Sequence, residues 1–212
     1  MNLFLTGTDT GVGKTYCAAL LVRGLRRAGF DTAAMKPICC GGRQDAELLR
    51  AAAGDTQELN EVNPVWLSTP ASPYAAAQLE KRDIDLDLIR ATYARLRKSR
   101  RSVIVEGVGG WLVPIARDYF VADLAADLGL PVAVVARNRL GALNHALLTV
   151  RAIQARGLEC AGIIWNNAGD APGDEISPAA TAGNRAILEE LAGVPILFDI
   201  AQGQREIVLG VA

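Results

Sequence analysis

A glycine-rich segment near the start of the chain, residues 7–15 with the sequence GTDTGVGKT, has the residue types that bind phosphate. It follows a short apolar run, residues 3–5, which predicts a strand, and it precedes a helical pattern. In such a loop, backbone N–H groups and the positive N-terminus of the next helix converge on phosphate oxygens. Lys14 adds a point charge and Thr15 offers a hydroxyl group to Mg²⁺. The segment therefore predicts a site for a nucleoside triphosphate with magnesium.

The spacing of this loop departs from the usual pattern, in which four residues separate the first glycine from Gly-Lys-Ser/Thr. That position is Thr8, and Gly7 stands one residue too early. A chance glycine-rich turn is one alternative. A dinucleotide-binding loop is another, but Tyr16 occupies the place of its third glycine, and Lys36 follows the predicted strand Thr32–Met35 where a ribose-binding carboxylate is expected. We favour the triphosphate site.

Composition favours one compact domain over residues 1–212. Half of the 212 residues are hydrophobic, which is enough for one substantial core. A net charge of −1, from 22 basic and 23 acidic residues, argues against a nucleic-acid surface. We see no apolar run long enough to span a membrane and no charged leader, so we expect a cytoplasmic protein with no membrane partner. The four cysteines lack paired metal-ligand spacing, and we expect reduced, mostly buried thiols.

Strand and helix patterns alternate along the chain. This alternation predicts an α/β fold of the P-loop NTPase kind, a doubly wound, mostly parallel sheet with helices on both faces. Strands are predicted at residues 3–5, 32–35, 102–106, 132–136, 160–165 and 195–199, and helices at 14–28, 45–53, 86–98, 121–128, 143–156 and 179–191. The region between residues 53 and 86 contains three X-Pro turn signals and is predicted to be largely irregular. We expect the strand at residues 32–35 to lie next to the first strand.

Three of these strands lead to a side chain that can do chemistry: Lys36 and Asn166 each follow a strand at once, and Glu106 ends one. In a doubly wound sheet, residues after the strands are drawn to one crevice. Glu106 could hold Mg²⁺ beside Thr15, and the small residues after it would let a phosphate or substrate approach the backbone. Lys36 could stabilise charge on a transferring phosphoryl group.

Other polar residues allow two interpretations each. Asp45 opens a predicted helix, where it is either a capping residue or a metal ligand. Asn144 lies at another helix entry, which either docks an anion or is an ordinary entry. His145, the only histidine, is expected to be packed or capping. Asn166 and Asn167 either contact an adenine edge or form a turn.

Four ordered motifs resemble those of the dethiobiotin synthetase family, and the resemblance covers nearly all of the chain. GTDTGVGKT resembles the family's GTDTxVGKT, including its early first glycine. KPICCG at residues 36–41 resembles KPxxSG, VEGVGG at 105–110 resembles VEGAGG, and LGALNHA at 140–146 resembles LGxxNHA. The resemblance implies an ATP-dependent carbon–nitrogen ligase of biotin biosynthesis that uses Mg²⁺ and acts as a homodimer.

The resemblance also implies residue roles. The catalytic lysines would be Lys14 and Lys36. The metal ligands would be Thr15, Asp45 and Glu106. ATP would be bound by Gly11, Val12, Gly13, Lys14, Thr15, Tyr16, Asp45, Glu106, Gly107, Val108, Gly109, Asn166 and Asn167. The substrate would contact Thr10, Lys36, Cys40 and Asn144, of which Asn144 would serve the neighbouring subunit's site.

The implied reaction begins with 7,8-diaminononanoate, whose amine captures CO₂ (from bicarbonate in solution) as a carbamate. ATP phosphorylates the carbamate, and the second amine closes the ring and releases phosphate. Carbamate and triphosphate are both anionic, so the lysines, the loop amides and Mg²⁺ are needed to bring them together. No protein nucleophile is required, in agreement with the absence of a Ser-His or Cys-His motif.

The chain departs from the family pattern at three places. Cys40 replaces the serine of KPxxSG, which exchanges a good hydroxyl donor for a weak thiol. Tyr74 stands where the family often has histidine. Around residues 201–203, the proline-containing segment that usually lines the nucleotide base is missing. These departures affect substrate binding and nucleotide selectivity more than phosphate binding.

Other proteins with this loop and fold provide competing hypotheses. An ATP-driven switch of the chromosome-partition or septum-positioning kind carries a second lysine early in the loop, where this chain has Asp9. An amidase of corrin synthesis usually has a glutaminase domain, which a chain this short lacks. A metal–nucleotide chaperone shares the fold, and fold alone does not separate the two functions.

Overall fold

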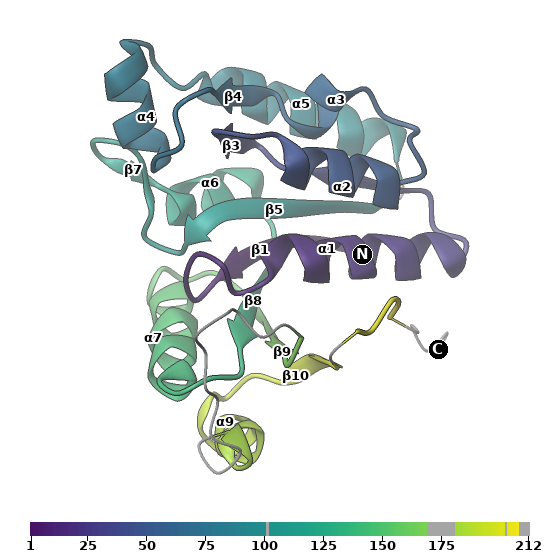
Figure 1. Ribbon diagram of the computed structural model, residues 1–212, viewed down its shortest axis with the longest axis vertical. Helices are drawn as coiled ribbons and strands as arrows, with labels where there is room; N and C mark the ends of the chain where they lie inside the picture. Colours follow the sequence, from purple (N-terminus) through teal and green to yellow (C-terminus); the bar gives the residue numbers. More distant parts are fainter. Residues whose placement is uncertain (101, 169–180, 202, 208–212) are drawn as a thin grey trace.

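The computed structural model describes residues 1–100, 102–168, 181–201 and 203–207, and its centre is a six-stranded sheet. The strands lie in the order β10-β9-β8-β1-β5-β2, and every neighbouring pair is parallel (Figure 1). Their bounds are β1 Asn2–Gly7, β2 Thr32–Met35, β5 Ser102–Gly110, β8 Val132–Arg137, β9 Cys160–Asn166 and β10 Ile196–Ile200. The predicted parallel sheet is confirmed.

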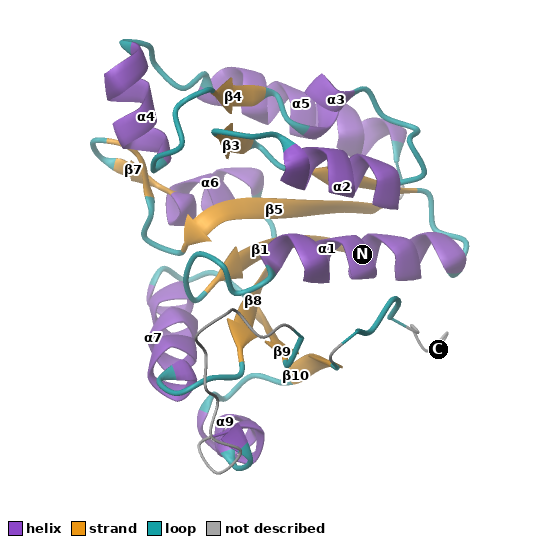
Figure 2. Cartoon of the chain, in the orientation of Figure 1, coloured by secondary structure: helices purple, strands orange, loops and turns teal. Residues whose placement is uncertain are grey.

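Helices cover both faces of this sheet (Figure 2). Their bounds are α1 Lys14–Arg27, α2 Gln44–Ala52, α3 Leu59–Val62, α4 Pro73–Glu80, α5 Leu86–Ser99, α6 Val121–Leu128, α7 Ala142–Ala155 and α9 Asn184–Leu191. Strand β1 shows why helices pack on both faces, because successive side chains of a strand point to opposite faces of the sheet. Leu3 and Leu5 pack in the cluster that contains α1, whereas Phe4 packs with α6 and α7 on the other face. Two cores therefore enclose the sheet, as predicted.

The expected position of the second strand is wrong. Strand β2 pairs with β5, and β5 lies between it and β1. The register aligns Met35 with Val105 and Leu5 with Glu106. Because Lys36 follows Met35 and Glu106 follows Val105 in this parallel register, the two residues still lie next to each other.

The region between residues 53 and 86 is more ordered than predicted. It contains α3, the strand β4 Val65–Leu67, which pairs with β3 Ile38–Cys40, and α4. A two-stranded hairpin, β6 Pro114–Ala116 with β7 Tyr119–Phe120, was also not predicted. These elements are too short for a hydrophobic period to develop. The predicted helix at residues 179–191 is seen as α9, and residues 179–180 lie outside the described part.

None of the helices in the described ranges is both long and apolar enough to cross a membrane. Cys17 and Cys39 are buried, Cys40 and Cys160 are half-buried, and all four are free thiols. The expectation that the cysteines are mostly buried therefore holds for two of them.

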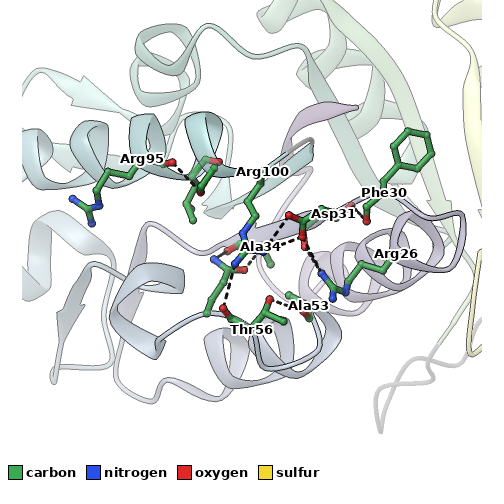
Figure 3. Close-up of polar contacts among 12 residues, drawn as sticks. Arg26, Phe30, Asp31, Ala34, Ala53, Thr56, Arg95 and Arg100 are labelled. Atoms are coloured by element: carbon green, nitrogen blue, oxygen red, sulfur yellow. Dashed lines mark hydrogen bonds and ion pairs between the residues drawn. The ribbon is translucent and has the colours of Figure 1, made fainter.

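The free edge of the sheet is covered by side chains around β2. Asp31, just before this strand, forms ion pairs with Arg26 at 3.6 Å and Arg100 at 2.9 Å, as Figure 3 shows. The buried side chain of Gln57 replaces a neighbouring strand: its Oε1 accepts from the N–H of Ala34 at 2.9 Å, and its Nε2 donates to the carbonyl of Ala34 at 3.1 Å. Both backbone groups of an edge residue are thereby satisfied.

We predict that Gln57→Leu lowers the free energy of unfolding by about 2–4 kcal/mol, because it leaves the buried N–H and carbonyl of Ala34 without partners. Urea unfolding followed by circular dichroism measures the change. Gln154→Leu, at an exposed position on α7, is the matched control and should change the value by less than about 0.5 kcal/mol. Equal effects of the two substitutions would contradict the edge-pairing role of Gln57.

Candidate active site

The loop of residues 7–15, here called the phosphate loop, joins β1 to α1 and leaves backbone donors open. Gly11 and Gly13 have φ angles of +73° and +90°, a region that favours glycine. Gly13 is the N-cap of α1, and no side chain caps the first turn of the helix. The end of β9 supports the loop, because Nδ2 of Asn166 donates to the carbonyl of Val12 at 2.9 Å. The positive end of α1 is therefore available to an anion.

A buried cluster of charges lies beside this loop. Nζ of Lys36 is 2.5 Å from Oε1 of Glu106 and 3.1 Å from Oδ2 of Asp45, and it also donates to the carbonyl of Gly107 at 3.3 Å. The hydroxyl of Thr15 donates to the same Oε1 of Glu106 at 2.8 Å. The structure thus brings together four of the predicted site residues from the ends of β2 and α1, from α2 and from within β5.

The two lysines of the site have different electrostatic surroundings. Burial and then the charge of Lys36 lower the pKa of Lys14 to about 8, and the ammonium group donates to the carbonyl of Asp9 at 3.1 Å. Burial also opposes the charge of Lys36, but Glu106 and Asp45 outweigh it, and the pKa of Lys36 is raised. Lys36 is therefore a permanent cation, whereas Lys14 would regain full protonation when a polyanion binds.

The donor set fits Mg²⁺. Oε2 of Glu106 is buried without a hydrogen-bond partner among the described residues, so it can accept a cation. Asp45 lies in the first turn of α2, but its side chain does not cap the helix. In the described ranges, no three His, Cys, Asp or Glu side chains form a metal cage. Mg²⁺ commonly takes one or two carboxylates together with phosphate oxygens and waters, so two carboxylates and the Thr15 hydroxyl suffice.

A cavity of about 880 Å³ opens over these groups. Thr10 and Cys40, two predicted substrate contacts, line it. Burial raises the pKa of Cys40 to about 11, so this half-buried thiol is neutral and only a weak donor. Sequence reasoning missed residues 70–73, which form part of the wall. Their prolines signalled turns, but nothing in the pattern linked those turns to the site.

The glycines after Glu106 have structural reasons of their own. A Cβ on Gly107 would lie 3.0 Å from the ring of Phe4, and one on Gly109 would lie 2.6 Å from Val113. Val108 and Gly109 line the cavity, and Gly107 is absent from its wall. Close packing therefore accounts for Gly107 without any ligand.

The two asparagines at the end of β9 are engaged with protein groups. Asn166 is 2% exposed, and its Oδ1 accepts from the N–H of Ala168 at 2.9 Å. Asn167 is exposed, donates to Asp199 at 2.5 Å and accepts from Asn138 at 2.8 Å. Contact of either residue with a nucleotide base stays a prediction.

Asn144 lies apart from the main cavity, on the exposed face of the first turn of α7. His145 is also exposed, and no side chain caps the start of α7, so the prediction of a packed or capping histidine is wrong. A smaller cavity of about 360 Å³ lies between the phosphate loop and α7, with Trp111 and Leu148 in its wall. One chain alone does not bring Asn144 to the charge cluster.

Comparisons with known proteins agree with this geometry. A family model described as an AAA domain matches residues 1–203. The ATP-dependent dethiobiotin synthetase BioD of Akkermansia muciniphila is 48% identical over 203 residues, which cover 96% of this chain and 93% of that protein. Among solved structures, the signal recognition particle 54 kDa protein of Aeropyrum pernix has a TM-score of 0.60 at 16% identity, covering 96% of this chain and 42% of that one. The septum site-determining protein MinD of Pyrococcus horikoshii has a TM-score of 0.55 at 17% identity, covering 95% and 82%. These two structures share the fold alone.

Proposed function

Because the chain belongs to the ATP-dependent dethiobiotin synthetase family, we propose that it is a ligase of biotin biosynthesis that converts 7,8-diaminononanoate, CO₂ and ATP to dethiobiotin, ADP and phosphate. The position of Lys36 is the observation that best supports this proposed reaction. Its ammonium group is held by Glu106 and Asp45 at the floor of a cavity that the phosphate loop also borders. A fixed cation next to a triphosphate site suits the joining of two anions.

The proposed chemistry balances in three steps. One amine of the substrate adds to CO₂ to give a carbamate and loses a proton. A carbamate oxygen then attacks the γ-phosphorus of ATP, and ADP leaves. The second amine attacks the carbamate carbon and expels phosphate, and its loss of a proton completes the cyclic urea. None of these steps needs a protein nucleophile.

The residues of the site bind and orient these anions. The amides of the phosphate loop and Lys14 would hold the triphosphate, and Lys36 would hold the carbamate and share the charge that develops during phosphoryl transfer. Mg²⁺, held by Thr15, Asp45 and Glu106, would neutralise charge on the triphosphate. Cys40 and Thr10 would border the substrate, with the neutral thiol contributing little hydrogen bonding.

A homodimer is part of this proposal, as is a cytoplasmic location. Apolar side chains stand exposed near Asn144: Leu140 is 84% exposed and Leu148 is 59% exposed. Leu112, 62% exposed, lies with Leu148 in the wall of the smaller cavity. A second copy seated there would cover this apolar surface and bring Asn144 toward the partner's site.

We predict that Asn144→Ala raises the KM for diaminononanoate about tenfold, through loss of a hydrogen bond to the substrate carboxylate, and leaves the Kd of ATP unchanged. Steady-state kinetics and ATP titration measure the two quantities. Asn144→Asp is the matched variant and should be worse, because it places a negative charge against the carboxylate. A fully active monomer in sedimentation would rule out the interface role of Asn144.

The decisive experiment for the function is mass-spectrometric detection of dethiobiotin. Purified protein is incubated with ATP, Mg²⁺, bicarbonate and 7,8-diaminononanoate, and each component is omitted in turn. Product that depends on every component would establish the reaction. Folded, ATP-binding protein that makes no product would instead indicate another substrate or the ATP-switch class.

The switch class has little support from the residues. Asp9 occupies the position of the early lysine that such proteins use, and its carboxylate pairs with Arg139 at 3.4 Å. The likeness to MinD, at 17% identity, concerns the fold.

A further inference from the structure

The side chain of Arg43 joins the start of α2 to α3, which packs beside it (Figure 1). Arg43 is half-buried and is the N-cap residue of α2, two positions before Asp45. Its Nε donates to Oδ1 of Asn63 at 2.9 Å, and its Nη2 donates to the backbone carbonyl of Asn63 at 2.9 Å. Nη2 also donates to the carbonyl of Leu59 at 3.3 Å and to Oδ1 of Asn60 at 3.0 Å. These bonds tie the first turn of α2 to α3 and to the residue that ends it.

The buried side chain of Asn63 extends this connection to Lys36. Asn63 is 1% exposed, and its Nδ2 donates to the carbonyls of Lys36 at 2.9 Å and Val65 at 2.8 Å. Its amide has one orientation, because a flipped amide would put its oxygen against two carbonyl oxygens. The N–H of Lys36 donates to the carbonyl of Val62 at 2.7 Å. Lys36 lies between β2 and β3 and belongs to neither strand, so these two bonds hold its backbone.

The aromatic side chain of Trp66, in β4, also holds the turn before α2. The centroid of its ring lies 5.9 Å from Cζ of Arg43, within the range of a cation–π contact. Its Nε1 donates to the carbonyl of Gly41 at 2.6 Å, and the N–H of Gly41 donates to the carbonyl of Leu67 at 2.9 Å. The turn that leads into α2 is therefore fixed by β4 as well as by Asn63.

The carboxylate of Asp45 depends on this backbone for its position. The side chain is 51% exposed and does not cap α2, so neither core packing nor a capping bond sets where the carboxylate lies. Its Oδ2 is nevertheless 3.1 Å from Nζ of Lys36. Because Asn63 holds the backbone of Lys36 and Arg43 holds the start of α2, the contact between Arg43 and Asn63 sets the separation of the two charges.

Resting on the proposed function, we propose that Arg43 is a positioning residue that acts through Asp45. Its bonds to Asn63 keep the first turn of α2 in place against Lys36, so that the carboxylate and the ammonium group meet at the floor of the main cavity. Arg43 itself is absent from the wall of that cavity, although the residues on either side of it line the wall. Its effect on the reaction is therefore indirect.

The first measurement is amide hydrogen exchange, followed by NMR, on the folded full chain without ligands. Arg43→Met keeps much of the aliphatic stem and removes the donors. We expect the amides of residues 47–49, which close the first turns of α2, to exchange about tenfold faster in this variant, as for loss of a hydrogen bond. Arg50→Met is the matched control, because it removes a 3.0 Å bond to Asp55 at the other end of the same helix. It should leave exchange at residues 47–49 within about twofold of the wild-type rate.

The second measurement is a double-variant cycle on dethiobiotin formation. We expect Arg43→Met to lower kcat about ten- to thirtyfold and to leave the Kd of ATP without Mg²⁺ within about twofold. In the Asp45→Asn background, the same substitution should lower kcat by less than about twofold, because the group that Arg43 positions is gone. A general loss of stability would act equally in both backgrounds. Arg43→Lys keeps a donor for Asn63 and should retain more activity than Arg43→Met, and Arg50→Met should leave kcat unchanged.

Either of two results would overturn the proposal. The first is unchanged exchange at residues 47–49 in Arg43→Met. The second is an equal loss of kcat in the wild-type and Asp45→Asn backgrounds, which would show that Arg43 does not act through Asp45. The exchange measurement needs no turnover. Wild-type protein that forms no dethiobiotin would therefore refute the proposed reaction, while faster exchange in Arg43→Met would still establish that Arg43 holds α2.

Discussion

Lys36→Gln is expected to lower kcat about 10²- to 10³-fold while the Kd of ATP stays within about twofold, because the lysine acts on charge that develops during transfer. The ammonium group of Lys36 lies 2.5 Å from Glu106 and 3.1 Å from Asp45, and its side chain is 5% exposed. A buried site has a low effective dielectric constant, so a cation there interacts strongly with an anion that binds next to it. Glutamine retains a donor for Glu106 but has no charge to share with the carbamate or the transferring phosphoryl group.

Two controls separate catalysis from folding for this variant. Removing one partner of a buried ion pair destabilises a protein, so circular dichroism and thermal unfolding must accompany the kinetics. Lys36→Arg keeps the charge and should retain more activity than Lys36→Gln, although its planar group fits the site less well. Lys98→Gln, at an exposed position on α5, should change nothing. Unchanged turnover in folded Lys36→Gln would remove Lys36 from the mechanism.

The parts of the site that the sequence predicted are those set by local pattern. The phosphate loop follows from a strand, a glycine-rich run and a helix that are contiguous in the chain. A general rule predicted the meeting of Lys36 with Glu106, because residues that follow parallel strands are drawn to one crevice. In the structure β5 continues to Gly110, and the two residues meet because the register aligns Met35 with Val105. The predicted contact is present although the predicted strand order is wrong. Strand β5 separates β2 from β1, and the side chains of Lys36 and Glu106 still form an ion pair.

The parts that could not be predicted depend on contacts between distant segments. Nothing near Gln57 indicates that its amide pairs with both backbone groups of Ala34. Asp45 could equally have capped α2, and only the approach of Lys36 in three dimensions decides against it. Asn166 looked like a base contact or a turn residue, whereas its side chain supports the phosphate loop.

The support given by Asn166 leads to a second large effect, at Gly13. Both Gly13 and Gly11 have positive φ angles, so alanine at either position costs about 1–2 kcal/mol in backbone strain. A Cβ on Gly13 would in addition lie 2.3 Å from Nδ2 of Asn166, whereas one on Gly11 would meet nothing within 4 Å. Asn166 cannot move aside freely, because it is 2% exposed and both ends of its amide are bonded.

We therefore predict that Gly13→Ala lowers the free energy of unfolding of the ligand-free protein by about 3–5 kcal/mol, against about 1–2 kcal/mol for Gly11→Ala. Urea unfolding without ATP measures both. The double variant Gly13→Ala with Asn166→Ala gives the sharper test, because removal of the Asn166 amide relieves the clash. Its cost should be at least about 1 kcal/mol smaller than the sum of the two single costs, since the residues are in contact. Strict additivity, or equal costs at the two glycines, would show that Gly13 is needed only for its backbone angle and that Asn166 does not hold the loop against it.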